Sequence, residues 1–418
     1  MTNEVETQEL FARHPLIPRM VRAGLESVCW RQDRYATGGI VESDERVDEG
    51  RKLYWPWCWP RTFIVEPLLA AGLNERVRRF LLFWERCQRP DGSWLHCYDI
   101  RDYREYPGWA ETDNVGYMLW HIYQYVTACH DEEFLSDHWS MVERASKFLQ
   151  SQFDERWDMI RGVEEAEVPE CGRMSIRYSL HINLICSMGL ACAAHLARQM
   201  HKEPLAEQWD QLSDRIQTKG IEQRLWDVRE NVFAFGITEE GRRVTAPVLW
   251  MTLMPHFLSH RWNDRIDGTL AYLDRKLYDK DDKIRRTYWP YDYSPVLVPG
   301  QPLDNRYSGM GVWVGGLPVL IAVCLKAGRL DKADEQLKIV TALTHPGNLL
   351  IPEHVNTLHP GRVGRYSVYP EPYYHVDSGN LLHLSFFLTL IARYSPSWLK
   401  QASGTETLAK ATAGSHAE

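Results

Sequence analysis

Glutamates in two irregular stretches of the chain are the residues best suited to acid–base chemistry. The stretch IRGVEEAEVPECG, residues 160–172, holds Glu164 and Glu165 side by side among glycine, proline and cysteine. The stretch THPGNLLIPEHVN, residues 344–356, places Glu353 directly after a short apolar run, between core and cleft. These carboxylates are therefore the first candidates for catalytic groups.

Two well-separated carboxylates are what inverting glycoside hydrolysis requires. One is protonated and gives its proton to the departing oxygen, while the other takes a proton from the attacking water, across a gap of about 6.5–9.5 Å. A second glutamate beside the acid helps it keep its proton, because adjacent negative charges repel. Glu164 and Glu165 fit this logic. Acidic loops are also commonly solvated surface, and nothing assigns a role to Glu167 or Glu170.

Aromatic residues with polar neighbours are a second signal. The chain contains 17 tryptophans and 20 tyrosines. Two stretches interleave them with charged groups: YWPWCWPR, residues 54–61, and RPDGSWLHCYDIRDYREYPGWAETDN, residues 89–114. Flat aromatic faces stack on sugar rings while polar neighbours hydrogen-bond the hydroxyls, so these stretches favour a carbohydrate site. The alternative is that the tryptophans supply bulk in a large helical core.

Helical periodicity dominates the rest of the chain, because apolar residues recur at spacings of three and four. Short extended pieces are expected near 231–248. The predicted helices cover residues 15–31, 61–72, 75–88, 112–129, 132–152, 175–200, 204–217, 245–258, 263–277, 310–327, 330–343 and 377–394.

The helices are expected to pair as antiparallel hairpins. In LLAAGLNERVRRFL and VCLKAGRLDKADEQL a glycine ends one helix just before the next begins. Twelve helices in hairpins predict an all-α fold, the (α/α)6 barrel. The longer connections (89–111, 153–174, 278–309 and 344–376) are then expected to gather at one end, where sites usually lie. Without a composition break, residues 1–400 are predicted to form one catalytic domain and 401–418 a flexible tail.

Composition excludes several classes of protein. A net charge of −8 argues against a nucleic-acid partner. Nine cysteines without a C-x-x-C pair indicate neither a zinc site nor a disulfide framework. The polar N-terminus is unlike a signal peptide, and no apolar run suggests a membrane span, so a cytoplasmic location is expected. No nucleotide motif or metal-spaced set occurs, so no metal or cofactor is expected. Oligomeric state is not indicated.

The order of these motifs resembles the glucoamylase family, glycoside hydrolase family 15, over roughly residues 50–395. YWPWCWPRTFIVEPLLAAGL is similar to the family's W-x-R-D helix, and the following RPDGSW to its DGS-type loop. ETDNVGYMLWHIYQY resembles the Q-x-D-x-x-G helix, and GVEEAEVPECG the W-E-E loop. NRYSGMGVWVGG resembles the R-Y-x-G-G-x-x-W segment, and GNLLIPEHVN the segment that holds the second catalytic glutamate.

The resemblance implies roles for individual residues. Glu164 would be the general acid, Glu165 would bind sugar on the leaving-group side, and Glu353 would be the general base that activates water. Arg61 would hydrogen-bond the hydroxyls of the terminal sugar. The remaining implied substrate-binding residues are Trp59, Trp109, Glu111, Asp113, Arg306 and Trp313, with Trp109 and Trp313 as walls.

Departures from the family pattern concern the sugar and its linkage. Thr62 replaces the aspartate of W-x-R-D, Val163 replaces the tryptophan of W-E-E, and Glu111 replaces the glutamine. YYHVDS, residues 373–378, stands where the family has W-S. The acid–base pair is thus better indicated than a preference for glucose. The expectation is a cytoplasmic single-domain member resembling isomaltose glucohydrolases, hydrolysing short, imported α-linked oligosaccharides.

Two other readings of the sequence stay open. One is another (α/α)6 enzyme, a sugar 2-epimerase or a polysaccharide lyase, because His181, His375 and His383 are available as acid and base. The other is a non-catalytic sugar-binding protein, which Thr62 in place of aspartate suggests. The sequence does not fix which sugar or linkage is used.

Overall fold

The computed structural model describes residues 4–43, 56–106, 110–162, 176–245, 247–277, 311–312, 314–356 and 374–404. Within them, six helices form an inner ring in which each packs on the next and the last packs on the first. The ring consists of α3 (Val65–Ala70), α5 (Thr112–Cys129), α9 (Leu180–Gln199), α11 (Leu249–Leu258), α13 (Leu317–Lys326) and α15 (Leu381–Tyr394).

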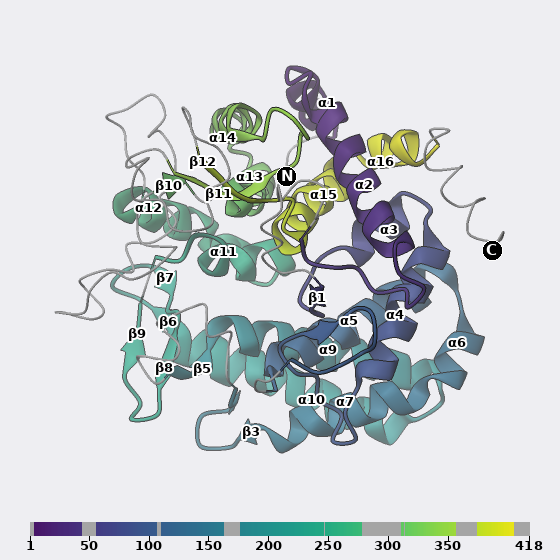
Figure 1. Cartoon of the computed structure of the whole chain (residues 1–418). Coiled ribbons are helices and arrows are strands. Elements are labelled where there is room, and N and C mark those ends of the chain that lie inside the picture. The colour runs from purple at the N-terminus through teal and green to yellow at the C-terminus, as the bar shows by residue number, and fades with distance from the viewer. Residues whose placement is uncertain are drawn as a thin grey trace.

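An outer layer of helices covers this ring. Its members are α2 (Ile17–Asp33), α4 (Asn74–Cys87), α7 (Trp139–Ser151), α10 (Glu203–Arg215), α12 (Ile266–Lys276) and α14 (Leu330–Leu343). Figure 1 shows α1 (Glu4–Ala12) and α2 beside α15 and α16 (Pro396–Ser403), so the first and last described helices pack together. This double ring confirms the predicted all-α (α/α)6 barrel.

Inner helices are apolar because neighbours cover them on all sides. Every residue of α13 from Leu317 to Leu325 is buried. Although the sequence suggested no membrane span, α9 is long and apolar enough for one by length and composition. In the barrel, 78% of that stretch is buried, between α5, α10 and α11. Its composition is that of a core helix.

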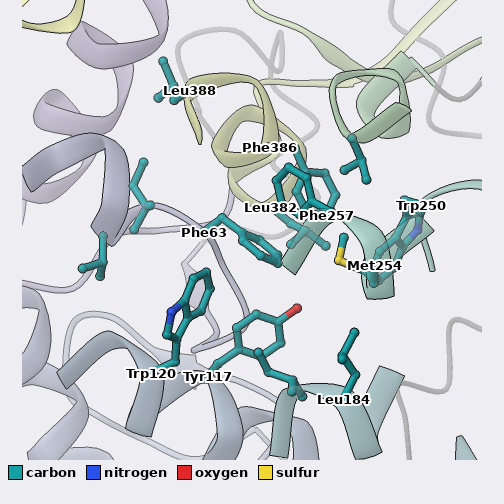
Figure 2. Packing of buried hydrophobic residues seen from close by; sticks show 14 of the residues in the cluster. Phe63, Tyr117, Trp120, Leu184, Trp250, Met254, Phe257, Leu382, Phe386 and Leu388 are labelled. Atoms are coloured by element: carbon teal, nitrogen blue, oxygen red, sulfur yellow. The ribbon is translucent and has the colours of Figure 1, made fainter. Parts of the chain in front are cut away.

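An aromatic cluster fills the middle of the ring. Figure 2 shows Phe63 between the rings of α5 below and those of α11 and α15 above. Its ring centroid lies 5.4 Å from Trp120, 5.7 Å from Phe257 and 4.9 Å from Phe386. The barrel is therefore a packed core at this level, and substrate would have to bind at one end.

The two ends of the barrel differ. Helices α3, α9 and α13 lead to their outer partners through short turns, such as those at Gly72 and Gly328, both with positive φ, whereas α6 lies between α5 and α7. Connections from outer to inner helices are longer and carry all the short strands of the described residues: β1 (Trp57–Cys58), β2 (Tyr98–Asp99), β3 (Phe153–Asp154), β4 (Met159–Ile160), β5 (Ile176–Ser179), β6 (Trp226–Asp227), β7 (Val232–Phe233), β8 (Gly236–Thr238), β9 (Arg243–Val244), β10 (Gly311–Val312), β11 (Pro352–Asn356) and β12 (Tyr374–Ser378). The described parts of the long connections thus gather at the amino ends of the inner helices, as predicted.

The predicted starts of several inner helices are wrong by about one to two turns. The helices predicted from residues 61, 175, 245, 310 and 377 begin at Val65, Leu180, Leu249, Leu317 and Leu381. The reason is visible before α9 and α15, where β5 and β12 run directly into a capping residue. The side chain of Ser179 accepts a hydrogen bond from the Ile182 N–H, and that of Asn380 accepts one from the His383 N–H.

Further differences from the predicted helices concern a division, two additional helices and a change of helix type. The helix predicted over 132–152 is divided at His138, whose backbone is not helical, into α6 (Glu132–Asp137) and α7. Helices α1 and α16 were not predicted, and α16 extends past the predicted tail boundary. Helix α10 continues as η1 (Ile216–Leu225), a wider π-helical segment.

Candidate active site

A buried pair of opposite charges lies at the amino end of the inner ring. Arg61 precedes α3 and Asp113 lies in the first turn of α5, where the helix dipole favours a carboxylate. Nη1 of Arg61 lies 3.8 Å from Oδ2 of Asp113, and the two side chains are 3% and 0% exposed. The structure thus brings together two residues that the sequence assigned to one pocket.

Two further residues belong to this group, His181 of α9 and Tyr117 of α5. Nδ1 of His181, in the first turn of α9, lies 3.9 Å from the same Oδ2 of Asp113. A hydrogen bond of 3.0 Å joins the Tyr117 hydroxyl to Nε2 of His181. When that hydroxyl donates, Nδ1 keeps the proton and faces the carboxylate. Tyr117 therefore orients His181, and His181 faces Asp113.

Close packing of α5 on α9 brings Asp113 and His181 together. A Cβ on Gly116 would lie 2.7 Å from the carbonyl oxygen of Ile185, and one on Gly189 would lie 2.8 Å from that of Gly116. Larger residues at this crossing would force the two backbones apart. The glycines therefore set the distance between the amino ends of α5 and α9.

A second group of contacts contains Trp59 and Glu111, the other two substrate-binding candidates that the structure describes. Nδ1 of His96 donates to Oε1 of the fully buried Glu111 over 2.8 Å. The His96 ring lies 5.4 Å from the Trp59 ring at 32°. Glu111 occupies the N-cap position of α5 but makes no capping bond, and Asn114 donates to its other oxygen. Its carboxylate is thus turned towards His96.

The segment that carries Arg61 is fixed to α15, the neighbour of α3 in the ring. The Phe63 N–H donates to Oγ of Ser385 over 2.9 Å, and Thr389 donates to the Phe63 carbonyl over 3.0 Å. Thr62, where the glucoamylase pattern has aspartate, is buried and its hydroxyl accepts the Ile64 N–H at 3.2 Å. It stabilises the turn into α3. Burial also lowers the pKa of the neighbouring His121 to about 4 and keeps it neutral.

The described residues that flank residues 163–175 of the acidic stretch lie beside the Asp113 group. Gly162 lies against the first turn of α5, since a Cβ there would be 2.8 Å from Oγ1 of Thr112 and 2.9 Å from Ile182. On the return side, β5 leads through Ser179 into α9 and hence to His181. Glu164 and Glu165 themselves lie outside the described residues, as do Val163, Glu167 and Glu170.

Glu353 lies in the middle strand of a three-stranded sheet. The strand order is β10-β11-β12, and the antiparallel register pairs Pro352 with Ser378 and His354 with Val376. Strand β12 leads into α15, the helix whose Ser385 and Thr389 hydrogen-bond the backbone of Phe63. The backbone of Glu353 therefore lies at the same end of the barrel as Arg61. Of the other predicted residues, Trp109, Arg306 and Trp313 lie outside the described residues.

Sequence reasoning missed His96 and Tyr117 as members of the site. Tyr117 could have been found, because it follows Asp113 by four residues and so lies on the same helix face. His96 gave no such signal, since its contact with Glu111 depends on how the loop folds back onto α5. Within the part of the chain that the structure describes, no group of three His, Cys, Asp or Glu side chains could hold a metal ion.

No family model matches the chain. The chain is 22% identical to an uncharacterized glycosyl hydrolase of Methanocaldococcus jannaschii over 218 residues. The matched segment covers 51% of this chain and 33% of that protein. The match therefore spans about a third of that relative's length.

Solved structures give a broader match. The fold is similar to that of a bacterial glucoamylase complexed with acarbose, with a TM-score of 0.57, 15% identity and coverage of 90% of this chain and 55% of that chain. It is also similar to the glucoamylase of Saccharomycopsis fibuligera, with a TM-score of 0.63, 10% identity and coverage of 93% and 95%. These similarities show that the chain has the glucoamylase-like (α/α)6 fold.

Proposed function

We infer that the chain is an inverting exo-glycoside hydrolase acting on small α-linked glycosides, with Glu164 as general acid and Glu353 as general base. The observation that carries this proposal is the convergence at one barrel end. The described residues that flank the Glu164 stretch lie at the first turns of α5 and α9, which carry Asp113 and His181. The Glu353 strand pairs with β12, which leads into α15, the helix that hydrogen-bonds the backbone of Phe63. Glucoamylase-like fold and the glycosyl hydrolase relative support the same class.

The proposed reaction assigns each group one step. Glu164 gives its proton to the glycosidic oxygen as the bond to the anomeric carbon breaks. Glu353 takes a proton from water, which attacks that carbon from the opposite face and inverts its configuration. Arg61 and Asp113 hydrogen-bond the hydroxyls of the terminal sugar, and Trp59 with His96 forms a wall. Glu165 binds the leaving sugar; Trp109, Arg306 and Trp313 complete the pocket.

The proposed substrates are α-glucosides of the isomaltose type, and the proposed location is the cytoplasm. The hydroxyl of Thr62 is engaged in the turn into α3 and does not replace the aspartate of the family pattern, so the choice of glucose rests on the resemblance alone. No metal or nucleotide takes part in the proposed reaction.

Product-anomer NMR on a panel of α-linked disaccharides tests the proposal. The β-anomer should appear first and mutarotate later. Glu164→Gln and Glu353→Gln should each lower kcat by about three orders of magnitude or more. Glu170→Gln, a matched change in the same acidic stretch, should leave kcat within about twofold. Release of the α-anomer first, or full activity of Glu353→Gln, would contradict the assignment.

His181 supports a second candidate, a sugar 2-epimerase. The histidine is buried, and its Nδ1 lies 3.9 Å from Oδ2 of Asp113. An epimerase would exchange a carbon-bound sugar proton with solvent, so incubation of monosaccharides in D₂O would give deuterated product. That activity should disappear in His181→Gln and survive in Glu353→Gln, which is the reverse of the pattern expected for the hydrolase.

A further inference from the structure

A cavity of about 470 Å³ lies at the other end of the barrel. This cavity, here called the basal pocket, is formed where α11, α13 and α15 end. Its lining includes Phe257, His260, Ala322, Lys326, Arg393 and Tyr394. The candidate active site lies at the amino ends of these same helices. The basal pocket is therefore separate from it and shares none of its residues.

Two cations line the basal pocket with donors to spare. Lys326 donates to the carbonyls of His256 and Ser259 over 2.7 and 2.6 Å. Arg393 donates to the Phe257 carbonyl and, through two nitrogens, to Glu66, each over 2.8 Å. An ammonium has three N–H donors and a guanidinium five. One donor of Lys326 and two of Arg393 thus have no hydrogen-bond partner among the described residues.

Helix capping explains only part of this arrangement. Cations are favourable at the carboxyl end of a helix, and Lys326 and Arg393 satisfy the last carbonyls of α11. However, Glu66 is the one carboxylate that pairs with either cation in the described residues, and no acidic residue lines the cavity. The pocket therefore has an excess of positive charge.

Neighbouring titratable groups respond to that excess. Burial and then Arg393 lower the pKa of Lys326 to about 8. Lys326, followed by burial and Arg393, lowers the pKa of His260, which is otherwise exposed. Burial, with a contribution from Lys326, lowers the pKa of His256 to about 3 and keeps it neutral. An anion in the pocket would relieve the repulsion between the two cations.

The remaining walls suit the body of a small molecule. Phe257, Ala322 and Tyr394 provide apolar and aromatic surface, and the volume lies within the range of small-molecule sites. Tyr394 is held in place because its hydroxyl donates to the Ala322 carbonyl over 3.1 Å. Charge at one side and rings at the other match a small ligand with an anionic head.

We propose that the basal pocket binds a phosphate monoester with a small apolar or ring-shaped body, its phosphate between Lys326 and Arg393. The double negative charge of such a group matches two adjacent cations, and its oxygens can accept all three available N–H groups. The proposal is independent of the reaction at the other end of the barrel.

Calorimetric titration of the full chain with phenyl phosphate, and separately with inorganic phosphate, tests the site. At pH 7 the ester should bind saturably with a Kd of about 1 mM or below, and more tightly than inorganic phosphate. Affinity should fall several-fold from pH 7 to pH 9, because Lys326 loses its proton in that range while Arg393 stays charged. Equal affinity for the two probes would overturn the role given to the apolar walls.

Substitutions locate the binding. His260 is exposed, so His260→Glu adds a repelling charge at the pocket without disturbing the core, and affinity should fall about tenfold. The neutral His260→Gln should bind within about threefold of the unchanged chain. Lys326→Gln should abolish binding, whereas the same change at the exposed Lys338 should not. Absence of saturable binding, or equal binding by His260→Glu and His260→Gln, would refute the site.

Discussion

At the scale of single residues, the link between His96 and Glu111 is the feature that sets this site apart from the pattern it resembles. A buried carboxylate is stable only when its oxygens are hydrogen-bonded. Here His96 and Asn114 supply those bonds, and His96 in turn lies against Trp59. Glu111, which stands where the family pattern has glutamine, is therefore the hydrogen-bond acceptor for His96.

Replacement of Glu111 tests that connection. Glu111→Gln keeps an acceptor for His96, so kcat/KM on an α-linked substrate should stay within about fivefold. Glu111→Ala removes the acceptor and leaves a space beside the buried Asn114, so kcat/KM should fall by about tenfold or more through KM. Steady-state kinetics of the two variants checks this. Equal loss in both would show that charge, and not the hydrogen bond, is what matters.

Buried neutral histidines predict how stability depends on pH. Burial lowers the pKa of His121 to about 4 and that of His256 to about 3. An unfolded histidine titrates near 6.5, so below that pH the unfolded chain binds more protons and folding stability falls. Each histidine should contribute a slope of up to about 1.4 kcal/mol per pH unit between pH 6 and 4.5.

Urea denaturation at several pH values measures this slope. His121→Asn should lower stability at pH 7, but it should also flatten the pH dependence, because one titrating group is lost. A variant of the exposed His130, His130→Asn, should keep the original slope. An unchanged slope in His121→Asn would show that the buried imidazole does not control acid sensitivity.

At the scale of elements, we expect the close approach of Gly162 to α5 to position the residues that follow it. A Cβ at Gly162 would meet Thr112 and Ile182 at less than normal contact distance. Gly162→Ala should therefore move the start of the stretch and lower kcat about tenfold or more, with little loss of melting temperature. Gly404→Ala is the matched control, since a Cβ there makes ordinary contacts. Equal activity of both variants would mean that the stretch is positioned from its other end.

Much of the element pattern was predictable, for reasons that particular segments show. The helices over 112–129 and 330–343 begin and end at the predicted residues, because polar residues and turns flank them. Before α9 the strand β5 runs into the helix with no turn between them, and periodicity cannot separate the two. The widening of α10 into η1 has no sequence signal of comparable strength.

The site divides along the same line. Arg61, Asp113, Trp59 and Glu111 were identifiable from their types and motif context, and the structure places them in two linked groups. The contact between Asp113 and His181 depends on how closely α5 packs on α9. His96 depends on a loop folding back over α5. Such contacts are tertiary, and local spacing carries little information about them.

At the scale of the whole molecule, the barrel is closed by contacts between the two ends of the chain. Arg31 in α2 is fully buried and donates to the carbonyls of Glu42 and Gly379. The N–H groups of Leu381 and Leu382, at the start of α15, donate back to Glu42. Because these early and late segments depend on each other, the chain is expected to unfold as one unit, and a single domain over 1–400 stays a prediction that this unfolding would test.

Arg31→Met is the sharpest test of this unity. The substitution leaves buried carbonyls at both ends of the chain without their charged donor, and it should lower the unfolding free energy by about 3–5 kcal/mol. Tryptophan fluorescence and far-UV circular dichroism should still give one coincident urea transition, shifted to lower concentration. Arg22→Met, an exposed change on the same helix, should shift the midpoint little. Two separated transitions in Arg31→Met would show that the halves of the ring fold independently, because loss of the closing contacts would then destabilise only the segments next to the seam.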